Sequence, residues 1–307
     1  MIRWPGPDAL RGHLAMLAFS ALVAGSFSLG ALAAPLIDPG ALTAARFLLA
    51  GAMVGAIAWG RGAIRRAMLR APWRYALLGG LLAAYFVLMF QGLKTAPPLS
   101  AAAVFTLTPL MAAGFGWVLL RQRLTPRMVF ALTLGALGAL WVIFRADLHA
   151  LLTLTLGRGE AIYFLGCIAH ALYAPLVRRL NRGEPALAFT FFTMVAGWLL
   201  LALWAHGPIR ATDWPALPGI VWITLLYLAV AASAASFVLL QYASLRLPAA
   251  KVMAYTYLTP AWVILWELAL GHQTPPILTL AGMLLIAAAL WLLLDEGPDP
   301  RSASATQ

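Results

Sequence analysis

The stretch Leu107-Thr108-Pro109 lies inside a long apolar run and recurs as Leu258-Thr259-Pro260, 151 residues further along the chain. At the same spacing, Phe86-Val87-Leu88 returns as Phe237-Val238-Leu239. Each match is weak by itself in such an apolar sequence, but the constant offset indicates that the chain contains an internal repeat.

The composition is that of a membrane protein. The hydrophobic residues Ala, Val, Ile, Leu, Met, Phe, Trp, Tyr and Cys make up 63% of the 307 residues, and only 10% of the residues are charged. A typical soluble domain carries about 25% charged residues, so much of this chain must face lipid. Ten runs reach the length of about 20 mainly apolar residues that a spanning helix needs. They lie near 13–34, 39–60, 72–93, 97–120, 125–144, 158–178, 185–206, 216–244, 249–271 and 275–294.

Basic residues between the spans orient the bundle. With a cytoplasmic N-terminus, sixteen of the 21 Lys and Arg residues fall on the cytoplasmic side. The other side holds only Lys94, Arg145, Arg158 and Arg210, and Arg46 lies within a span. By the positive-inside rule we expect both termini in the cytoplasm and an even number of spans. The first run could pass for a signal peptide, but it is long enough to span and others follow, so we expect it to be retained.

The repeat divides the spans into two groups of five. Repeat one covers about 11–145 and repeat two about 157–294, within a single membrane domain of residues 1–296. Residues 297–307 are expected to form a disordered cytoplasmic tail. Because five is odd, the predicted fold is an all-α membrane protein of two inverted five-helix repeats. This plan is common in secondary transporters, whose substrate sites lie near the bilayer midplane. Channels and some membrane enzymes are also duplicated, so the repeat supports transport without proving it.

These features resemble a known family. Ten spans as five plus five, Ala45-Arg46-Phe47 in the second span, and Thr-Pro within spans four and nine are similar to the EamA family of the drug/metabolite transporter (DMT) superfamily. Within it, the sequence resembles the aromatic amino acid exporters of the YddG type. The resemblance covers nearly the whole chain. It implies a multi-pass exporter in the bacterial inner (plasma) membrane, and it points to the sixth span, around His170, for substrate contact.

Polar residues inside the spans are the candidates for a binding site, because ionisable residues there are costly and usually face a cavity or a partner. His170 lies mid-span, and Tyr163 and Tyr173 fall on the same helical face. This stripe indicates a cavity wall, although a lone helical His is often only hydrogen-bonded in place. The candidate substrate-binding residues are His170, Tyr85, Thr106, Thr108, Tyr163, Tyr173, Tyr257, Ser236, Met89 and Phe105.

The two Leu-Thr-Pro units predict bends in spans four and nine. A proline inside a helix has no N–H group, so the carbonyl four residues earlier loses its hydrogen-bond donor. In the two Leu-Thr-Pro units these carbonyls are those of Phe105 and Thr256. We expect Pro109 and Pro260 to act as hinges near the midplane. The alternative is an inert packing kink, which is common in membrane helices.

Arg46 and Glu267 both fall toward the outer ends of their spans. The functional interpretation is a gating pair on the periplasmic side. The simpler interpretation is that each side chain extends to the membrane interface.

The chemistry that the sequence lacks narrows the function. There is no GxxxxGK[ST] loop and no HExxH, and the five His residues are scattered, so we expect no catalytic residues, metal site or cofactor. The basic residues form short clusters between spans, so nucleic acid is not an expected partner. Aromatic rings, Thr, Met and His without a mid-span carboxylate suit a neutral or zwitterionic molecule with an apolar body.

The sequence therefore predicts a secondary transporter that exports amino acids, aromatic ones preferred, by alternating access around a midplane cavity. Its expected partners are this small molecule and the lipid bilayer, and the sequence does not determine an oligomeric state. One alternative is an exporter of other small neutral or amphipathic metabolites or drugs. A second, of a different class, is a membrane enzyme or lipid-handling protein.

Overall fold

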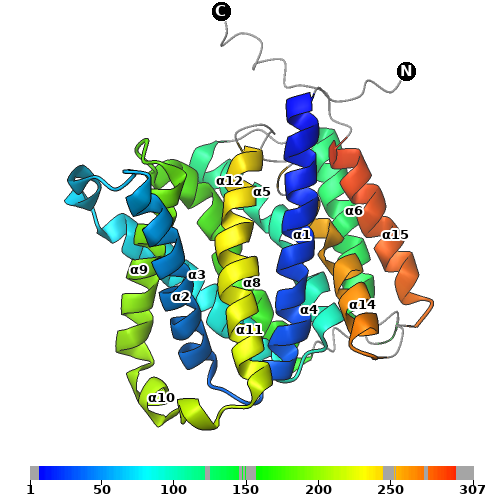
Figure 1. Ribbon diagram of the computed structural model, residues 1–307. Coiled ribbons are helices and arrows are strands. Elements are labelled where there is room, and N and C mark those ends of the chain that lie inside the picture. The colour runs from blue at the N-terminus through cyan, green and yellow to red at the C-terminus, as the bar shows by residue number, and fades with distance from the viewer. Residues whose placement is uncertain are drawn as a thin grey trace, which may run out of the picture.

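The computed structural model describes residues 7–121, 125–144, 147, 149, 157–244, 252, 254–272 and 276–294. Within these ranges the regular structure is entirely helical (Figure 1). Eight segments are long and apolar enough to cross a membrane. The ninth and tenth predicted spans have shorter helices within the described ranges, and the predicted tail lies outside them.

Each of the five spans predicted in the first half of the chain corresponds to helical structure. The helices are α1 (Pro7–Ala33), α2 (Pro39–Gly60), α3 (Trp73–Leu93), α4 (Pro98–Phe105) followed by α5 (Thr108–Leu120), and α6 (Pro126–Ile143). A short 3₁₀ turn, Arg66–Arg70, precedes α3.

The second half follows the same plan. Its helices are α8 (Arg158–Leu180), α9 (Ala186–Trp204), α11 (Gly219–Ala229) continued by α12 (Ser236–Ser244), α14 (Thr259–Ala269) and α15 (Thr279–Leu294). A six-residue helix, α10 (His206–Ala211), and a 3₁₀ turn, Trp214–Ala216, connect α9 to α11.

Local sequence sets where several of these helices begin. α2, α4 and α6 each carry a proline in the first turn, where the missing N–H costs no hydrogen bond. The Asp38 carboxylate caps α2 by accepting from the Gly40 and Ala41 N–H groups at 2.8 and 3.1 Å. The Thr125 hydroxyl caps α6 by accepting from the Met128 N–H at 3.2 Å. Such caps satisfy N–H groups that have no partner within the helix.

Equivalent helices of the two halves pack against one another in opposite directions. α2 and α9 meet where Gly40 faces Trp204 at one end and where Gly55 faces the Phe191 ring at the other. Residue numbers therefore rise in one helix as they fall in its partner. α6 and α15 pair in the same antiparallel way. These pairings are those expected of two halves related by a two-fold axis across the bundle.

The third span of each half also packs against the first span of the other half. α3 lies along α8, and α11 and α12 lie along α1. A Cβ atom on Gly92 would come within 2.6 Å of the Gly159 carbonyl oxygen, so the absence of side chains here lets α3 and α8 approach closely. On the other side, the Thr224 hydroxyl donates to the Leu29 carbonyl of α1 at 3.2 Å. The main hydrophobic core lies between the halves.

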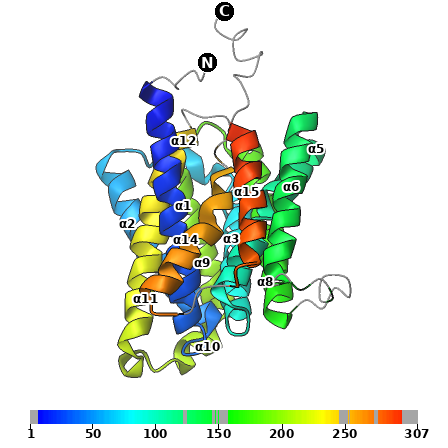
Figure 2. The ribbon, with the colours of Figure 1, turned by 90° about the vertical axis from the view of Figure 1, so that its right-hand side faces the viewer.

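The start of α1 and the end of α15 lie at the same end of the bundle in both views (Figures 1 and 2). This is the arrangement that an even number of crossings requires. The predicted cytoplasmic location of that end stays a prediction.

Both Leu-Thr-Pro units interrupt their helices. α4 ends at Phe105 and α5 begins at Thr108, directly before Pro109. In the ninth span a 3₁₀ turn, Tyr255–Leu258, precedes α14. The Thr256 carbonyl is not left without a donor, contrary to expectation, because the tighter turn brings it the N–H of the first residue of α14.

A third interruption lies in the eighth span, where a π-helical turn, Val230–Ala235, joins α11 to α12. π-helical turns are rare and are frequently found at functional sites.

Candidate functional site

Five of the predicted residues come together at the contact between the halves. The His170 ring of α8 stacks on the Tyr85 ring of α3, with 4.4 Å between centroids. Phe105 of α4 lies 5.6 Å from His170, and Tyr173 stacks at 6.2 Å on the imidazole. The hydroxyl groups of Tyr85 and Tyr163 form a hydrogen bond of 3.1 Å. The first half of the chain thus contributes two of these rings and the second half three.

Phe27 of α1 completes this group. Its ring lies 5.9 Å from Phe105 and 6.0 Å from Tyr163. Nothing in the apolar sequence of α1 distinguishes Phe27 from its neighbours, so the sequence did not point to it. We refer to Phe27, Tyr85, Phe105, Tyr163, His170 and Tyr173 as the aromatic cluster.

Accessibility changes along the α8 face of the aromatic cluster. Tyr163 and Cys167 are buried, whereas His170 and Tyr173, one and two turns further along, are half-buried. The end of α8 lies beside the start of α3, as shown by the hydrogen bond that Arg74, near the start of α3, donates to the carbonyl of Leu180, the last residue of α8. Within the aromatic cluster, the more exposed rings of α8 therefore lie toward the end where α8 finishes, and the buried Tyr163 ring lies toward the end where α8 begins.

Several buried polar atoms of the described residues have no hydrogen-bond partner. They are Ser28 Oγ, Arg46 Nη1, Thr108 Oγ1, His170 Nδ1, Tyr257 OH, Thr259 Oγ1 and Glu267 Oε1. A buried polar group without a partner costs about 1–3 kcal/mol. Thr108 and Thr259 are the threonines of the two Leu-Thr-Pro units, and His170 lies at the centre of the aromatic cluster.

The predicted gate between Arg46 and Glu267 is not formed in this structure. Arg46 donates from Nε to the Ser233 hydroxyl at 2.9 Å and from Nη2 to the Ala232 carbonyl at 3.1 Å. Glu267 instead contacts His272, with 2.8 Å between Oε2 and Nδ1. The physical reason is the packing: α2 faces the π-helical turn, whereas α14 packs on α1 and α4. Arg46 does not extend to the interface either, since it is 1% exposed.

The remaining predicted residues lie outside the aromatic cluster or have other partners. The Ser236 hydroxyl donates to a carbonyl of the π-helical turn at 3.3 Å. The Thr106 hydroxyl is bonded to a backbone carbonyl of its own turn at 2.7 Å. The Tyr257 ring packs on α6, where a Cβ on Gly135 would lie 2.7 Å from the phenol. Met89 is buried one turn from the Tyr85 level of α3.

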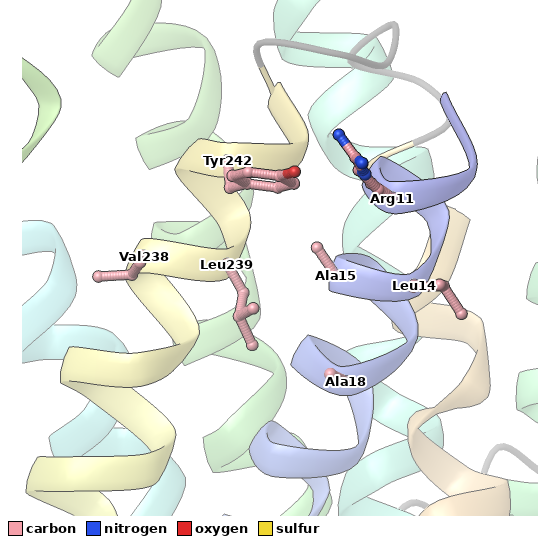
Figure 3. A pocket seen from close by; sticks show the side chains of 7 residues that line it. All are labelled: Arg11, Leu14, Ala15, Ala18, Val238, Leu239 and Tyr242. Atoms are coloured by element: carbon pink, nitrogen blue, oxygen red, sulfur yellow. The ribbon is translucent and has the colours of Figure 1, made fainter. Parts of the chain in front are cut away.

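A separate hollow of about 420 Å³ lies between α1 and α12. Figure 3 shows Arg11 and Tyr242 toward one end and apolar side chains along the rest. Its lining is Arg11, Leu14, Ala15, Ala18, Val238, Leu239 and Tyr242. The polar groups of this lining, those of Arg11 and Tyr242, lie at one end, and none of the unpartnered buried atoms of the described residues belongs to it. Within the described ranges, no three His, Cys, Asp or Glu side chains gather as metal ligands would.

Span-length apolar helices, paired antiparallel around a buried aromatic and polar centre, define a multi-pass membrane protein. The model of the EamA-like transporter family matches the chain twice, over residues 10–144 and 157–295. The chain therefore belongs to the EamA-like transporter family and carries its domain twice. The prediction of this family and of a multi-pass bacterial inner-membrane location is confirmed.

Two curated bacterial proteins are similar to the chain. The uncharacterized transporter YyaM of Bacillus subtilis (strain 168) is 25% identical over 283 residues, covering 91% of this chain and 92% of that protein. The aromatic amino acid exporter YddG of Ancylobacter novellus is 35% identical over 130 residues, which cover 42% of this chain and 43% of that exporter. A solved crystal structure aligns with a TM-score of 0.67 at 24% identity, covering 94% of this chain and 96% of its own, and thus shares the fold.

Proposed function

We propose that this chain is a secondary transporter that exports amino acids, with a preference for aromatic ones, by alternating access around the aromatic cluster. The observation that carries the proposal is the position of the aromatic cluster between the two halves. Tyr85 and Phe105 come from the first half, and Tyr163, His170 and Tyr173 come from the second. A substrate held by these rings would contact both moving parts.

The chemistry of the aromatic cluster fits a small molecule with an aromatic body and polar ends. Stacked and tilted ring pairs stabilise one another by about 0.5–1.5 kcal/mol beyond the apolar area that they bury. The unpartnered Nδ1 atom of His170 offers a polar contact within the aromatic cluster, and the Thr108 hydroxyl, next to the Cys167 thiol of α8, offers a second one. The similarity to an aromatic amino acid exporter, over less than half of the chain, supports the same substrate class.

The antiparallel pairing of equivalent helices supports alternating access. Two inverted halves can exchange conformations, so that one side of the bundle closes as the other opens. The breaks before Pro109 and Pro260 are hinges in this proposal, because each separates two helical segments of one span. With the termini in the cytoplasm, the end of the aromatic cluster with the more exposed rings, toward Tyr173, faces the cell interior.

The test is counterflow of labelled amino acids into proteoliposomes that hold the purified full chain. We expect uptake of tyrosine, tryptophan and phenylalanine, and a several-fold loss of that uptake in Phe105→Ala. The matched control is Phe130→Ala, because Phe130 is 61% exposed on α6 and outside the aromatic cluster. Equal loss in both variants, uptake of amphipathic drugs alone, or an activity on lipid without any flux would each overturn the proposal.

A further inference from the structure

Arg46 is a cation enclosed by neutral groups. Its side chain is 1% exposed, and its Nε and Nη2 groups donate to the Ser233 hydroxyl and the Ala232 carbonyl. Nη1 has no hydrogen-bond partner, and within the described ranges no carboxylate forms an ion pair with Arg46. A buried charge is costly unless it is paired and hydrogen-bonded. The natural complement of this guanidinium is therefore an anionic group.

The π-helical turn fixes one side of the guanidinium. In a regular α-helix the Ser236 N–H would bond to the Ala232 carbonyl, four residues earlier. Here that N–H donates to the carbonyls of Ala231 and Ser233 instead. The Ala232 carbonyl accepts from Arg46 Nη2. Two nitrogens of the Arg46 guanidinium, Nε and Nη2, are thus bonded to the second half of the chain, and Nη1 is left for another partner.

The same guanidinium lies next to the aromatic cluster. Its Cζ atom sits 3.7 Å from the centroid of the Phe86 ring, a cation–π contact that keeps the charge in place without neutralising it. The Phe86 ring contacts the Tyr85 ring at 4.6 Å, and Tyr85 stacks on His170. A continuous path of ring contacts therefore leads from the charge on α2 to the centre of the aromatic cluster.

We propose that Arg46 binds the carboxylate of the transported molecule through its free Nη1 edge, while the aromatic cluster holds the apolar body. The proposal rests on the function proposed above and narrows the substrate class to amphipathic molecules with one carboxylate. Arg is suited to this role because its guanidinium carries several N–H donors, so that two nitrogens can hold the π-helical turn while Nη1 donates to the carboxylate. A single guanidinium with one unused nitrogen fits one carboxylate better than a phosphate group with its greater charge.

The experiment compares three competitors of labelled tryptophan counterflow by the full chain in proteoliposomes at neutral pH. These are tryptophan, tryptophanamide and tryptamine, which share the indole ring and amine but differ in the carboxylate. In the wild type we expect tryptophan to compete at least tenfold better than either analogue, equivalent to about 1.4 kcal/mol. In Arg46→Gln we expect this ratio to fall to about twofold while competition by the amide is unchanged. Arg46→Lys, which keeps the charge but not the guanidinium, should give an intermediate ratio.

The outcomes separate the two proposals. Counterflow of tryptophan with equal competition by acid and amide in the wild type would overturn the role of Arg46 and leave the transport function standing. A tenfold ratio that persists in Arg46→Gln would do the same. Absence of any amino acid counterflow in the wild type would overturn both. The control Arg210→Gln, at an exposed arginine, should keep the wild-type ratio. If Arg46→Gln does not fold, Arg46→Lys decides, and a ratio equal to that of the wild type would overturn the role of Arg46.

Discussion

The contact between α3 and α9 provides a sharp test of how closely the two halves must pack. A Cβ atom added to Gly79 would lie 2.5 Å from both the Gly197 nitrogen and the Thr193 carbonyl oxygen. Both atoms are backbone and cannot turn aside. At the next residue, Gly80, the nearest atom is the end of the Leu200 side chain at 3.4 Å, an ordinary contact. The two glycines therefore form a matched pair on one helix.

The expected magnitude follows from this difference. Both Gly79→Ala and Gly80→Ala raise helix propensity by the same amount, about 1 kcal/mol, so that contribution cancels between them. Gly79→Ala must also push α3 and α9 apart by about an ångström, and overpacking of this kind costs about 1–3 kcal/mol. Gly79→Ala should thus be less stable than Gly80→Ala by that amount.

Thermal unfolding of the two purified variants in the same detergent measures the difference. At about 2 °C per kcal/mol for a chain of this size, the melting temperature of Gly79→Ala should lie about 2–6 °C below that of Gly80→Ala. Equal melting temperatures would refute the close backbone contact between the halves.

Three further substitutions have effects whose direction follows from the structure. Glu184 lies between α8 and α9 and accepts from Arg74 at 2.7 Å, with side-chain exposures of 7% and 2%. Burial alone would raise the pKa of Glu184, but hydrogen bonds from Arg74 and the Arg182 N–H outweigh it and hold the pKa below its ordinary value. Glu184→Gln should lower the free energy of unfolding by about 2 kcal/mol, which is the usual contribution of a hydrogen bond to a charged group. Because the pKa of Glu184 is lower in the folded than in the unfolded protein, its carboxylate stabilises the fold at pH values above the unfolded-state pKa. This stabilisation is lost as the pH falls through the folded-state pKa. Melting temperatures measured against pH should therefore converge for wild type and Glu184→Gln in acid, and a constant gap would contradict this. Thr108→Val should raise or preserve the melting temperature while reducing transport, because the hydroxyl that it removes is buried without a partner. Thr106→Val should lower the melting temperature, since it removes a bonded hydroxyl; the reverse order would show that the assignment of these two hydroxyls is wrong.

Some features of the site could be predicted from residue spacing because they depend on a single helix. Tyr163, His170 and Tyr173 share one face of α8 by helical periodicity, and the structure places all three in the aromatic cluster. The breaks at the two Leu-Thr-Pro units follow from the missing N–H of proline. Neither inference needed to know which helices are neighbours.

Other features depend on neighbours that are distant in the sequence. Phe27 joins the aromatic cluster only because α1 packs at the contact between the halves. Arg46 and Glu267 look alike by depth in the membrane, yet their helices face different partners. The π-helical turn that receives Arg46 has no local signal, because Val230–Ala235 is a run of small and apolar residues compatible with a regular helix.

By itself, the amino-acid sequence determined that the chain is a helical membrane protein with an internal repeat, because apolar length and constant offset are properties of the chain alone. The tertiary structure decided which polar side chains meet. Hydrogen bonds and ring contacts act over a few ångströms, and helix packing across the two halves sets those distances.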